Sequence, residues 1–233
     1  MKLIRSIFIF LLILITSACL LAYAHGYLKF KEATKEVSIE EKVQKIKSTK
    51  NYTSIDKIPQ IYIDAVVSVE DRRFYTHEGF DLVGTFRAFC VNFSSKSLRE
   101  GGSTITQQLA KNMYFPLDNT LERKLAEVIV ALEIEKKYSK DEILELYFNI
   151  IYYGSGYYNI HDASYGYFGK SPSEMNAYEA TLLAGVPNAP SVYSPKVNLE
   201  LSHKRQEKVV SSLVDNKIIS EDEAKKILSF QMK

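Results

Sequence analysis

The most apolar segment of the chain lies near its N-terminus. No residue from Ser6 to Leu28 carries a full charge, and the stretch from Ile7 to Ile15 is almost wholly aliphatic or Phe. Because about 20 apolar residues suffice to cross a bilayer, this segment predicts one transmembrane helix. Lys2 and Arg5 precede it. The positive-inside rule therefore places the N-terminus in the cytoplasm and exports the rest of the chain.

Two alternatives compete with a retained membrane anchor. A cleaved signal peptide has a shorter apolar core and a small-residue cleavage site, which residues 22–24 (AYA) match loosely. A lipoprotein site at Ser17-Ala18-Cys19 is the second alternative, although Thr16 stands where such sites usually carry Leu. The length of the apolar segment favours the retained anchor.

Residues 29–50 are rich in Lys and Glu and contain few apolar positions. This pattern is typical of a solvated stalk. Globular patterning begins at about Ile55, and neither an internal repeat nor a low-complexity segment follows it in the sequence. We therefore expect three parts: a cytoplasmic tip and anchor at 1–28, a charged stalk at 29–54 and a folded domain at 55–233.

The folded part is patterned for helices. Apolar residues between Leu121 and Leu132 recur at helical spacing, which predicts a helix there. Strand-like alternation is limited to short candidate pieces around residues 150–153, so the predicted fold class is mostly α. Ser-x-x-Glu capping boxes mark three further helix starts. They begin at Ser139, Ser171 and Ser220.

Composition excludes several classes of protein. A hydrophobic fraction of 46% and a charged fraction of 25% are ordinary for a folded protein and exclude extended disorder. The formal net charge of +2 gives no overall bias towards nucleic acid. The two cysteines, Cys19 and Cys90, form neither a zinc-binding spacing nor a disulfide framework.

Glu70 is the first candidate for catalytic chemistry. On a helix, Val67 and Phe74 lie on the same face as Glu70, three residues before it and four after it. A carboxylate on an apolar face is costly unless it is paired or neutralised. A carboxyl group in such a place suits a general base or acid. The alternative is a structural ion pair with Arg72 or Arg73.

The segment from Gly101 to Asn112 is the second candidate. Its two glycines allow a ligand to approach the backbone closely, and Thr104 with Gln107 forms a capping box that begins a helix. The N–H groups and the positive end of this helix favour an anion such as phosphate. Lys111 adds a charge two turns further on. The alternative is a well-capped surface helix.

Arg123 and Glu127 are the third candidate. They lie four residues apart on one predicted helix, so they share a face. An ordinary surface salt bridge is the simplest explanation of such a pair. None of the three candidates is specific by itself.

Five ordered blocks of sequence, which include all three candidates, resemble the peptidoglycan glycosyltransferases. This is the lysozyme-like transglycosylase family shared by class A penicillin-binding proteins and monofunctional enzymes. The resemblance extends from about Ile55 to the early 200s, and a chance match of five ordered blocks is negligible. It implies a lysozyme-like, two-lobed helical domain preceded by the transmembrane helix. The blocks are 70–79 (EDRRFYTHEG), 101–112 (GGSTITQQLAKN), 123–127 (RKLAE), 138–154 (YSKDEILELYFNIIYYG) and 167–195 (YFGK to YSP).

The resemblance implies an inverting transferase that polymerises lipid II into glycan strands. The 4-hydroxyl of an acceptor attacks the anomeric carbon of the growing chain, and a lipid pyrophosphate leaves. By this resemblance Glu70 is the catalytic base. Glu127 is the second catalytic carboxylate, which orients the site or holds a divalent cation, Mg²⁺ or Mn²⁺, near the pyrophosphate. The resemblance assigns contacts with substrate or phosphate to Ser103, Thr104, Gln107, Gln108, Lys111, Asn112, Arg123 and Lys124.

The resemblance also implies a single-pass protein of the bacterial cytoplasmic membrane with its catalytic domain on the outer face. Its implied partners are lipid II, the growing glycan strand, the membrane and other cell-wall synthesis proteins, and nucleic acid is not among them. Between the first two blocks the family has a mobile apolar lobe that dips into the membrane. The alternative is that the apolar residues there pack in the core. Those at helical spacing are Phe86, Phe89, Cys90 and Phe93.

The chain departs from the family pattern in two places. Residues 159–165 are more polar than the Gly/Ala-rich run expected after Tyr153-Gly154, which leaves the acceptor contacts there unassigned. Asn119 stands where some relatives carry a second basic residue that contacts phosphate. We therefore expect fewer cationic contacts with the leaving group.

Two other functions compete with polymerisation. One is a lytic enzyme on the same scaffold, although such an enzyme needs no anion clamp beside a membrane anchor. The other is an inactive membrane-tethered scaffold, which has no use for Glu70 and Glu127 on apolar faces. The sequence contains neither a Lys-Thr-Gly motif nor a further domain with a Ser-x-x-Lys nucleophile. We therefore expect a monofunctional transferase without crosslinking activity.

Overall fold

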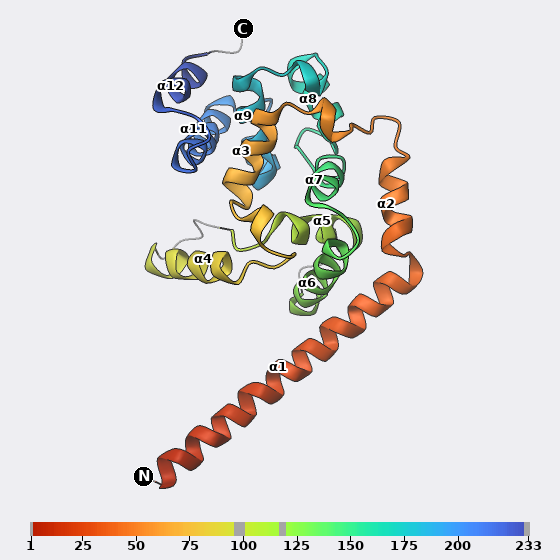
Figure 1. Ribbon diagram of the computed structural model, residues 1–233, viewed down its shortest axis with the longest axis vertical. Helices are drawn as coiled ribbons and strands as arrows, with labels where there is room; N and C mark the ends of the chain where they lie inside the picture. Colours follow the sequence, from red (N-terminus) through yellow and green to blue (C-terminus); the bar gives the residue numbers. More distant parts are fainter. Residues whose placement is uncertain (1, 96–100, 117–119, 231–233) are drawn as a thin grey trace.

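The structure, a computed structural model, is helical throughout the parts that it describes, residues 2–95, 101–116 and 120–230 (Figure 1). The predicted mostly α fold is confirmed, and the candidate strand pieces around residues 150–153 are irregular instead. Extended pairing within these ranges is limited to one isolated bridge between Glu78 and Phe80. The helices are α1 (Lys2–Glu36), α2 (Ile39–Lys47), α3 (Gln60–Glu70), α4 (Leu82–Ser95), α5 (Ile105–Tyr114), α6 (Leu121–Glu135), α7 (Lys140–Phe148), α8 (Ile160–Phe168), α9 (Ala177–Gly185), α10 (Pro190–Tyr193), α11 (Leu199–Asp215) and α12 (Glu221–Ser229).

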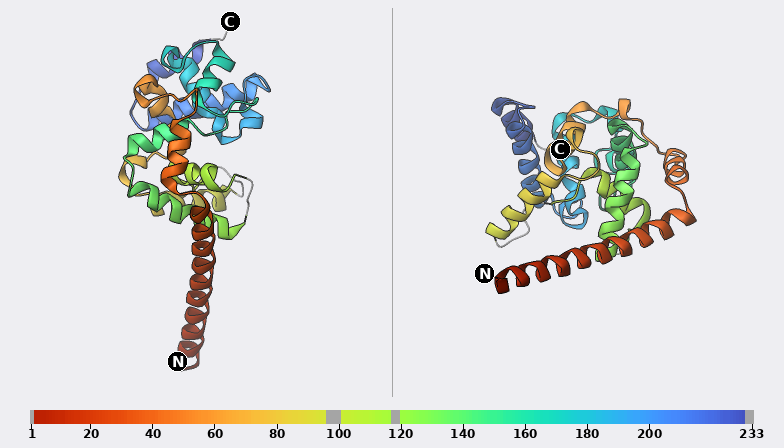
Figure 2. Two further views of the ribbon diagram at one scale, coloured as in Figure 1. Left: turned by 90° about the vertical axis from the view of Figure 1, so that its right-hand side faces the viewer. Right: turned by 60° about the horizontal axis from the view of Figure 1, so that its bottom comes forward.

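The folded domain consists of two groups of helices (Figures 1 and 2). In one group α3 packs against α9 and α11, α8 contacts α9, and α12 contacts both α9 and α11. In the other group α5 packs against α6 and α7, with α4 beside them. One apolar core joins both groups. At its centre the hydroxyl groups of Tyr62 and Tyr153, both fully buried, are 2.6 Å apart, which satisfies two polar groups that burial would otherwise leave unpaired.

Helix starts follow the predicted caps with one exception. Ser139 and Ser220 form complete capping boxes at the first turns of α7 and α12. Ser171 also forms one, but it begins only a 3-10 turn, Pro172–Glu174, after which the backbone becomes extended at Met175. α9 then begins anew, because Asn176 forms a second capping box with Glu179. Two competing caps five residues apart thus separate the short turn after Ser171 from α9.

α1 is one continuous helix that includes the predicted anchor and the first part of the predicted stalk. Within the described residues, Ile4–Glu36 is the one helix long and apolar enough to cross a membrane, a property that a signal sequence shares. Its N-terminal half projects away from the domain, whereas its C-terminal half packs against α6 (Figure 2). The structure therefore agrees with an apolar N-terminal helix that either anchors the protein or directs its export.

α2 differs from the solvated stalk that its charge content predicted. Ile39, Val43 and Ile46 are buried, and they belong to the main apolar core. Their spacing of four and three residues forms a single narrow apolar stripe. The charged residues face outward, and Glu40 pairs with Lys137 at 2.6 Å. The high proportion of Lys and Glu in this segment concealed the stripe from an argument based on composition.

α4 carries the apolar residues predicted to form a membrane-facing lobe. Phe86 is 68% exposed and Phe93 is 77% exposed, and Cys90 is exposed as well. Packing in the core is therefore excluded for Phe86 and Phe93. The side chain of Phe89 lies outside the described part of the structure.

Candidate active site

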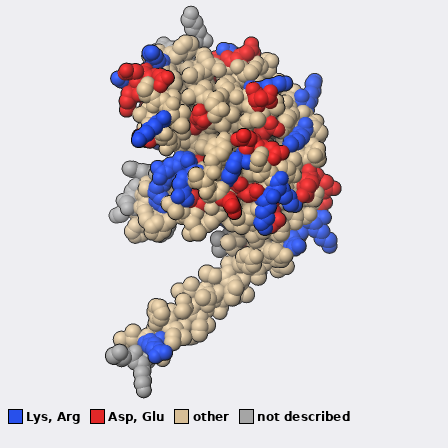
Figure 3. All heavy atoms as spheres, in the orientation of Figure 1, with Lys and Arg blue, Asp and Glu red and all other residues tan. Residues whose placement is uncertain are grey.

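A polar cleft of about 720 Å³ lies between the two groups of helices. Its walls come from the end of α3, the first half of α4, the start of α5 and α6, and one face of α11. Figure 3 shows Lys and Arg side chains gathered on the surface between α4 and α11. All but one of the predicted site residues line this cleft. They are Glu70, Ser103, Thr104, Gln107, Gln108, Lys111, Arg123, Lys124 and Glu127.

Glu70 is the last residue of α3, and its side chain is only 10% exposed. Its Oε1 atom accepts a hydrogen bond from Arg205 Nη2 at 3.1 Å, and its Oε2 atom accepts one from Gln108 Nε2 at 3.1 Å. The C-terminal end of a helix disfavours a negative charge, so the guanidinium group of Arg205 supplies the compensating charge. The carboxylate is thus held where α3, α5 and α11 meet.

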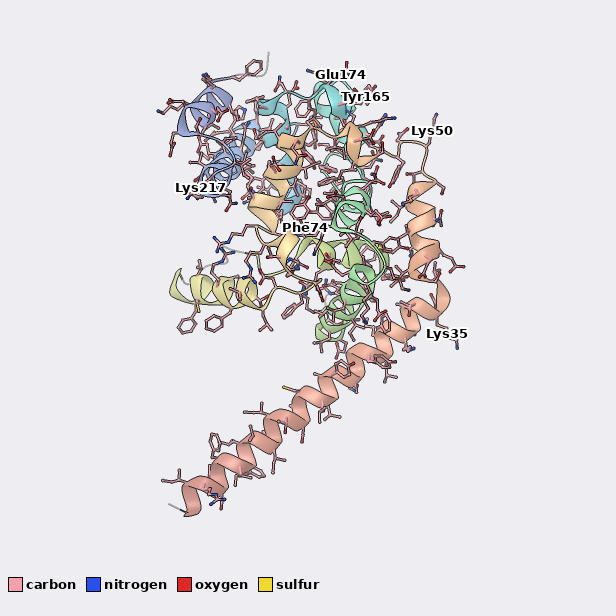
Figure 4. The ribbon with its side chains drawn as sticks, viewed as in Figure 1. Lys35, Lys50, Phe74, Tyr165, Glu174 and Lys217 are labelled. Atoms are coloured by element: carbon pink, nitrogen blue, oxygen red, sulfur yellow. The ribbon has the colours of Figure 1, made fainter. Side chains whose placement is uncertain are left out.

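The predicted alternative for Glu70, an ion pair with a neighbouring arginine, is wrong. Arg73 instead binds Asp81, with 2.9 Å between its Nε atom and Asp81 Oδ2, and Arg72 is exposed. The helix that was expected to carry Phe74 also ends at Glu70, so Phe74 lies in a separate 3-10 turn. Phe74 is nevertheless fully buried near the centre of the domain (Figure 4).

Tyr147 orients the side-chain amide of Gln108. The Tyr147 hydroxyl donates to Gln108 Oε1 at 3.1 Å, which leaves the Nε2 atom of the amide directed at Glu70. Burial raises the pKa of Tyr147 well above its ordinary value, so this hydroxyl stays a neutral donor. In this structure Gln108, which was predicted to contact substrate, holds the carboxylate of Glu70 in place.

The first motif also supports the start of α5. The buried Asp71 carboxylate accepts the backbone N–H of Ile105 at 3.0 Å and lies 2.9 Å from His77 Nε2. The Thr104 hydroxyl donates to the carbonyl of Gly79 at 2.8 Å. Gly79 has a φ of +77°, a left-handed conformation that favours glycine. These roles of Asp71 and His77 were not predicted from the sequence.

The predicted anion site at the N-terminus of α5 is partly occupied by the protein itself. The N–H group of Ile105 binds Asp71, and the N–H group of Gln107 binds the Thr104 hydroxyl at 3.1 Å. These two N–H groups are therefore not free for phosphate, contrary to the prediction. Gln107 is 1% exposed, and its Nε2 donor has no hydrogen-bond partner within the described residues. A ligand acceptor or a water molecule in the cleft would satisfy this donor.

Glu127 forms the centre of a cationic cluster on α6. Its side chain is 1% exposed, and its Oε1 atom lies 2.6 Å from Arg123 Nη1. Its Oε2 atom lies 3.1 Å from Lys124 Nζ, which also donates to Ser103 Oγ at 2.7 Å. The surface salt bridge proposed as the simpler explanation is excluded, because the carboxylate is buried. Two cations around one carboxylate leave a net positive charge that faces the cleft together with Lys111.

The residues present do not fit a divalent metal ion held by Glu127. Both of its carboxylate oxygens already bind cationic side chains, which would repel a second cation at the same oxygens. Beside a pyrophosphate, Mg²⁺ needs only one or two protein carboxylates, because phosphate oxygens and water supply its other ligands. Neither carboxylate oxygen of Glu127 is free of a cationic partner to serve as such a ligand. Glu127 therefore orients Arg123 and Lys124 in this structure.

Three further predictions concern Asn112, the polar run 159–165 and Asn119. Asn112 does not line the cleft, and its Nδ2 atom donates to the Gln108 carbonyl at 2.8 Å within α5. Its predicted substrate contact stays a prediction. The polar run 159–165 serves to cap α8, because Asn159 accepts the N–H of Asp162 at 2.7 Å. Tyr165 in this run lies far from α4 (Figure 4). Asn119 lies outside the described residues.

The contribution of α11 to the cleft was not predicted from the sequence. Arg205 pairs with Glu70, and Lys208 also lines the cleft. One signal was available. Ser202 and Val209 are buried on the same face, three residues before Arg205 and four after it. An arginine between buried positions of one helix needs a partner, but the pattern does not show that this partner lies 135 residues earlier.

The fold and cleft together define a class of protein: a helical enzyme with a carboxylate and a cationic cluster on one polar cleft, and an apolar helix at its N-terminus. A family model described as Transglycosylase matches residues 35–214. The chain belongs to this family, and it is a transglycosylase, that is, an enzyme of the peptidoglycan glycosyltransferase family.

Several known proteins are similar over much of the chain. A relative from Cupriavidus necator, named as a transglycosylase, is 40% identical over 223 residues, which are 96% of this chain and 95% of the relative. Penicillin-binding protein 1A of Aquifex aeolicus is 44% identical over 172 residues, 74% of this chain and 24% of that protein. The Neisseria gonorrhoeae protein of the same name is 43% identical over 171 residues, 73% and 21% of the two chains. This chain thus spans about a quarter of the penicillin-binding proteins that it matches.

Among solved structures, the crystal structure of penicillin-binding protein 1A from Haemophilus influenzae matches with a TM-score of 0.48. The match has 24% sequence identity and covers 78% of this chain and 18% of that chain.

Proposed function

We propose that this transglycosylase polymerises lipid II into glycan strands by inverting transfer, with Glu70 as the catalytic base. The observation that carries the proposal is the pairing of two features in one cleft. Glu70 is held by Arg205 and Gln108 on one side. The cluster of Arg123, Lys124 and Glu127 lies along the same cleft on α6.

The proposed reaction assigns one proton transfer to Glu70. The carboxylate takes the proton of the acceptor 4-hydroxyl as that oxygen forms a bond to the anomeric carbon of the growing chain. The bond between this carbon and the pyrophosphate oxygen breaks, and the electron pair leaves with the pyrophosphate. A single displacement inverts the anomeric centre and needs no covalent intermediate with the enzyme. Because both oxygens of Glu70 are already hydrogen-bonded, the carboxylate keeps one orientation.

The leaving pyrophosphate would bind the cationic cluster. Arg123 and Lys124 retain a net positive charge after they neutralise Glu127, and Lys111 adds another. Within the described residues Lys111 has no acidic partner, so its charge is available to a ligand. Arginine suits bidentate contacts with phosphate, and lysine supplies a point charge. We assign to these cations the stabilisation of the negative charge that develops as the pyrophosphate leaves.

A retained membrane anchor fits this substrate. Lipid II and the growing strand are both attached to the membrane by their lipid, so the cleft must lie near the bilayer surface. α1 is apolar enough to span the bilayer, and its charged residues Lys2 and Arg5 precede the apolar segment. We propose a single pass with the N-terminus in the cytoplasm and the domain on the outer face.

The test is glycan-chain formation from purified lipid II by the full-length protein in detergent or vesicles. Glu70→Gln keeps the shape of the side chain and removes its basicity. Loss of a general base typically lowers the rate by about 10²–10⁴-fold, or about 3–5.5 kcal/mol of barrier. Glu207→Gln is the matched control, because Glu207 is an exposed glutamate on α11. A thermal melt of each variant verifies folding.

The expected result is polymer from wild type and from Glu207→Gln, and at least a hundredfold less from folded Glu70→Gln. If folded Glu70→Gln polymerises as fast as wild type, Glu70 is not the base. If wild type makes no polymer but releases soluble fragments from purified cell wall, the protein is a lytic enzyme. If it does neither, an inactive scaffold replaces the transferase.

A further inference from the structure

We propose that α1 is a positioning element of the active site in addition to a membrane anchor. The proposal rests on the proposed function, since it concerns how the pyrophosphate cluster on α6 is held. α1 and α6 pack side by side, and the views in Figures 1 and 2 agree on this. Because α6 carries Arg123, Lys124 and Glu127, any displacement of α6 displaces the whole cluster.

The contact follows one stripe of small and apolar residues on α1. Residues on the other faces of this half of α1 are mostly exposed, whereas the stripe is buried or half-buried. Its members recur at spacings of four, four and three residues, which keeps them on one face of a helix. Small residues at such spacing let two helices approach closely, as they do inside membranes. The stripe consists of Ala22, Gly26, Phe30 and Ala33.

α1 approaches α6 closely at Gly26. A Cβ atom added to Gly26 would lie 2.5 Å from Leu125 Cβ and 3.4 Å from the backbone nitrogen of Ala126. Carbon atoms prefer a separation of about 3.5–4.0 Å, so the two helices would have to move apart by about 1 Å. Leu125 is adjacent to Lys124 and two residues from Glu127. Gly26 therefore packs against the part of α6 that carries the cluster.

Lys29 makes a second contact one turn further along α1. Its Nζ atom donates to Thr120 Oγ1 at 3.3 Å. Thr120 is the N-cap residue of α6, and its hydroxyl accepts the backbone N–H of Arg123 at 3.2 Å. α1 thus contacts α6 at its cap and at its second turn, on both sides of Arg123. Two contacts along α6 fix its orientation relative to α1 as well as the distance between the two helices.

Anchor packing would then set the position of the cationic cluster relative to the bilayer. Gly26 lies in the apolar segment from Ser6 to Leu28, near the end that emerges from the membrane. α1 would then hold the cationic cluster close to the bilayer surface, where the pyrophosphate of a lipid-linked substrate lies. Glu70 belongs to α3, so α1 influences the pyrophosphate cluster more directly than the base. A displacement of about 1 Å in a catalytic site can lower a rate by about 10²-fold.

The test uses full-length protein in vesicles with lipid II as substrate. Gly26→Leu places a side chain between α1 and α6, and Ala24→Leu, on the exposed face of the same helix, is the matched control. We expect kcat/KM for Gly26→Leu to fall at least tenfold, mainly through a lower kcat because the cations act on charge that develops in the transition state, with Ala24→Leu within twofold of wild type. Hydrogen exchange of the α6 amides, measured on the same samples, should be faster in Gly26→Leu and unchanged in Ala24→Leu.

An exchange of the small residue across the interface provides a rescue. Gly26→Ala adds only the Cβ atom that meets Leu125 Cβ, and Leu125→Gly removes that partner. We expect Gly26→Ala to lower kcat and the combined variant to return it towards the wild-type value. A general loss of stability would not be reversed by a second glycine in a helix, which costs about 1 kcal/mol relative to alanine.

Three results would overturn the proposal: an unchanged kcat in Gly26→Leu, equal effects of Gly26→Leu and Ala24→Leu, or unchanged exchange of the α6 amides. Failure of the proposed function is distinguishable, because wild type itself would then make no polymer. In that case the hydrogen-exchange comparison still decides whether α1 holds α6.

Discussion

Substitution of Arg205 tests directly how the fold holds and orients the carboxylate of Glu70. Its Nη2 atom lies 3.1 Å from Glu70 Oε1, and the two side chains are 12% and 10% exposed. Its Nε atom also donates to the Gly185 carbonyl at 3.4 Å. Arg205→Met keeps the length and most of the packing of the side chain while it removes the charge. Glu70 would then keep one neutral donor, Gln108.

The expected loss of stability can be estimated from this geometry. Removal of one partner from a fully buried ion pair costs about 3–5 kcal/mol. The slight exposure of both side chains and the remaining hydrogen bond to Gln108 reduce this cost. We therefore expect Arg205→Met to lower the free energy of unfolding by about 1–3 kcal/mol, which is in the range of a hydrogen bond to a charged group. For a domain of this size that corresponds to a decrease in Tm of about 2–12 °C. Polymerisation should fall about 10–100-fold, because the base loses one of the two contacts that orient it.

A double-mutant cycle separates a role through Glu70 from a general role of Arg205 in folding. In a Glu70→Gln background, Arg205→Met should cost less stability and should lower the residual rate by no more than about twofold. Arg205→Lys is the control, since it keeps the charge and loses the planar fork. Polymerisation and urea unfolding are measured for all variants. If the losses in rate simply multiply across the cycle, Arg205 does not act through Glu70 and the reasoning is refuted.

Two further predictions concern the cations and acids that line the cleft. Because Arg123 and Lys124 occupy both oxygens of Glu127, a chelator should leave polymerisation by wild type within about twofold; a large loss that Mg²⁺ or Mn²⁺ restores would contradict this assignment. Burial raises the pKa of Asp81, but the hydrogen bonds from Arg73 and a backbone N–H outweigh it and hold that pKa below its ordinary value. Asp81→Asn should therefore lower the unfolding free energy by about 1–3 kcal/mol at pH 7. The stabilisation by Asp81 is present above its unfolded pKa of about 3.9 and is lost as the pH falls through the lower folded value. Urea unfolding at pH 7 and at pH 3 tests this, and an equal difference at both pH values would show that the charge of Asp81 is not responsible.

Local pattern was sufficient for most of the helices. The apolar run of α1, the periodicity of α6 and the capping boxes at Ser139 and Ser220 were all read correctly from the sequence. These features depend on contacts between residues three or four positions apart, so neighbours along the chain suffice to specify them. Local pattern was insufficient at Ser171, because Asn176 provides a competing cap and the pattern alone does not rank the two.

The candidate site was predicted as a set of motifs, and the structure brings nearly all of them to one cleft. Their partners were not predicted. Arg205 for Glu70 and Asp71 for the start of α5 are contacts over 135 and 34 residues. No periodicity encodes such pairs, because they form only after separate helices have packed.

The sequence by itself determined the class of this protein: a helical transglycosylase with an apolar N-terminal helix, a carboxylate on α3 and a cationic cluster on α6. Only the tertiary structure decided what each charged group does. It buries Glu127 between two cations, and it turns Gln108 towards Glu70. It also packs α2 into the core and Gly26 against Leu125. The physical reason is that charge, hydrogen bonding and close approach depend on distances between helices, whereas a sequence pattern reports only on neighbours within one helix.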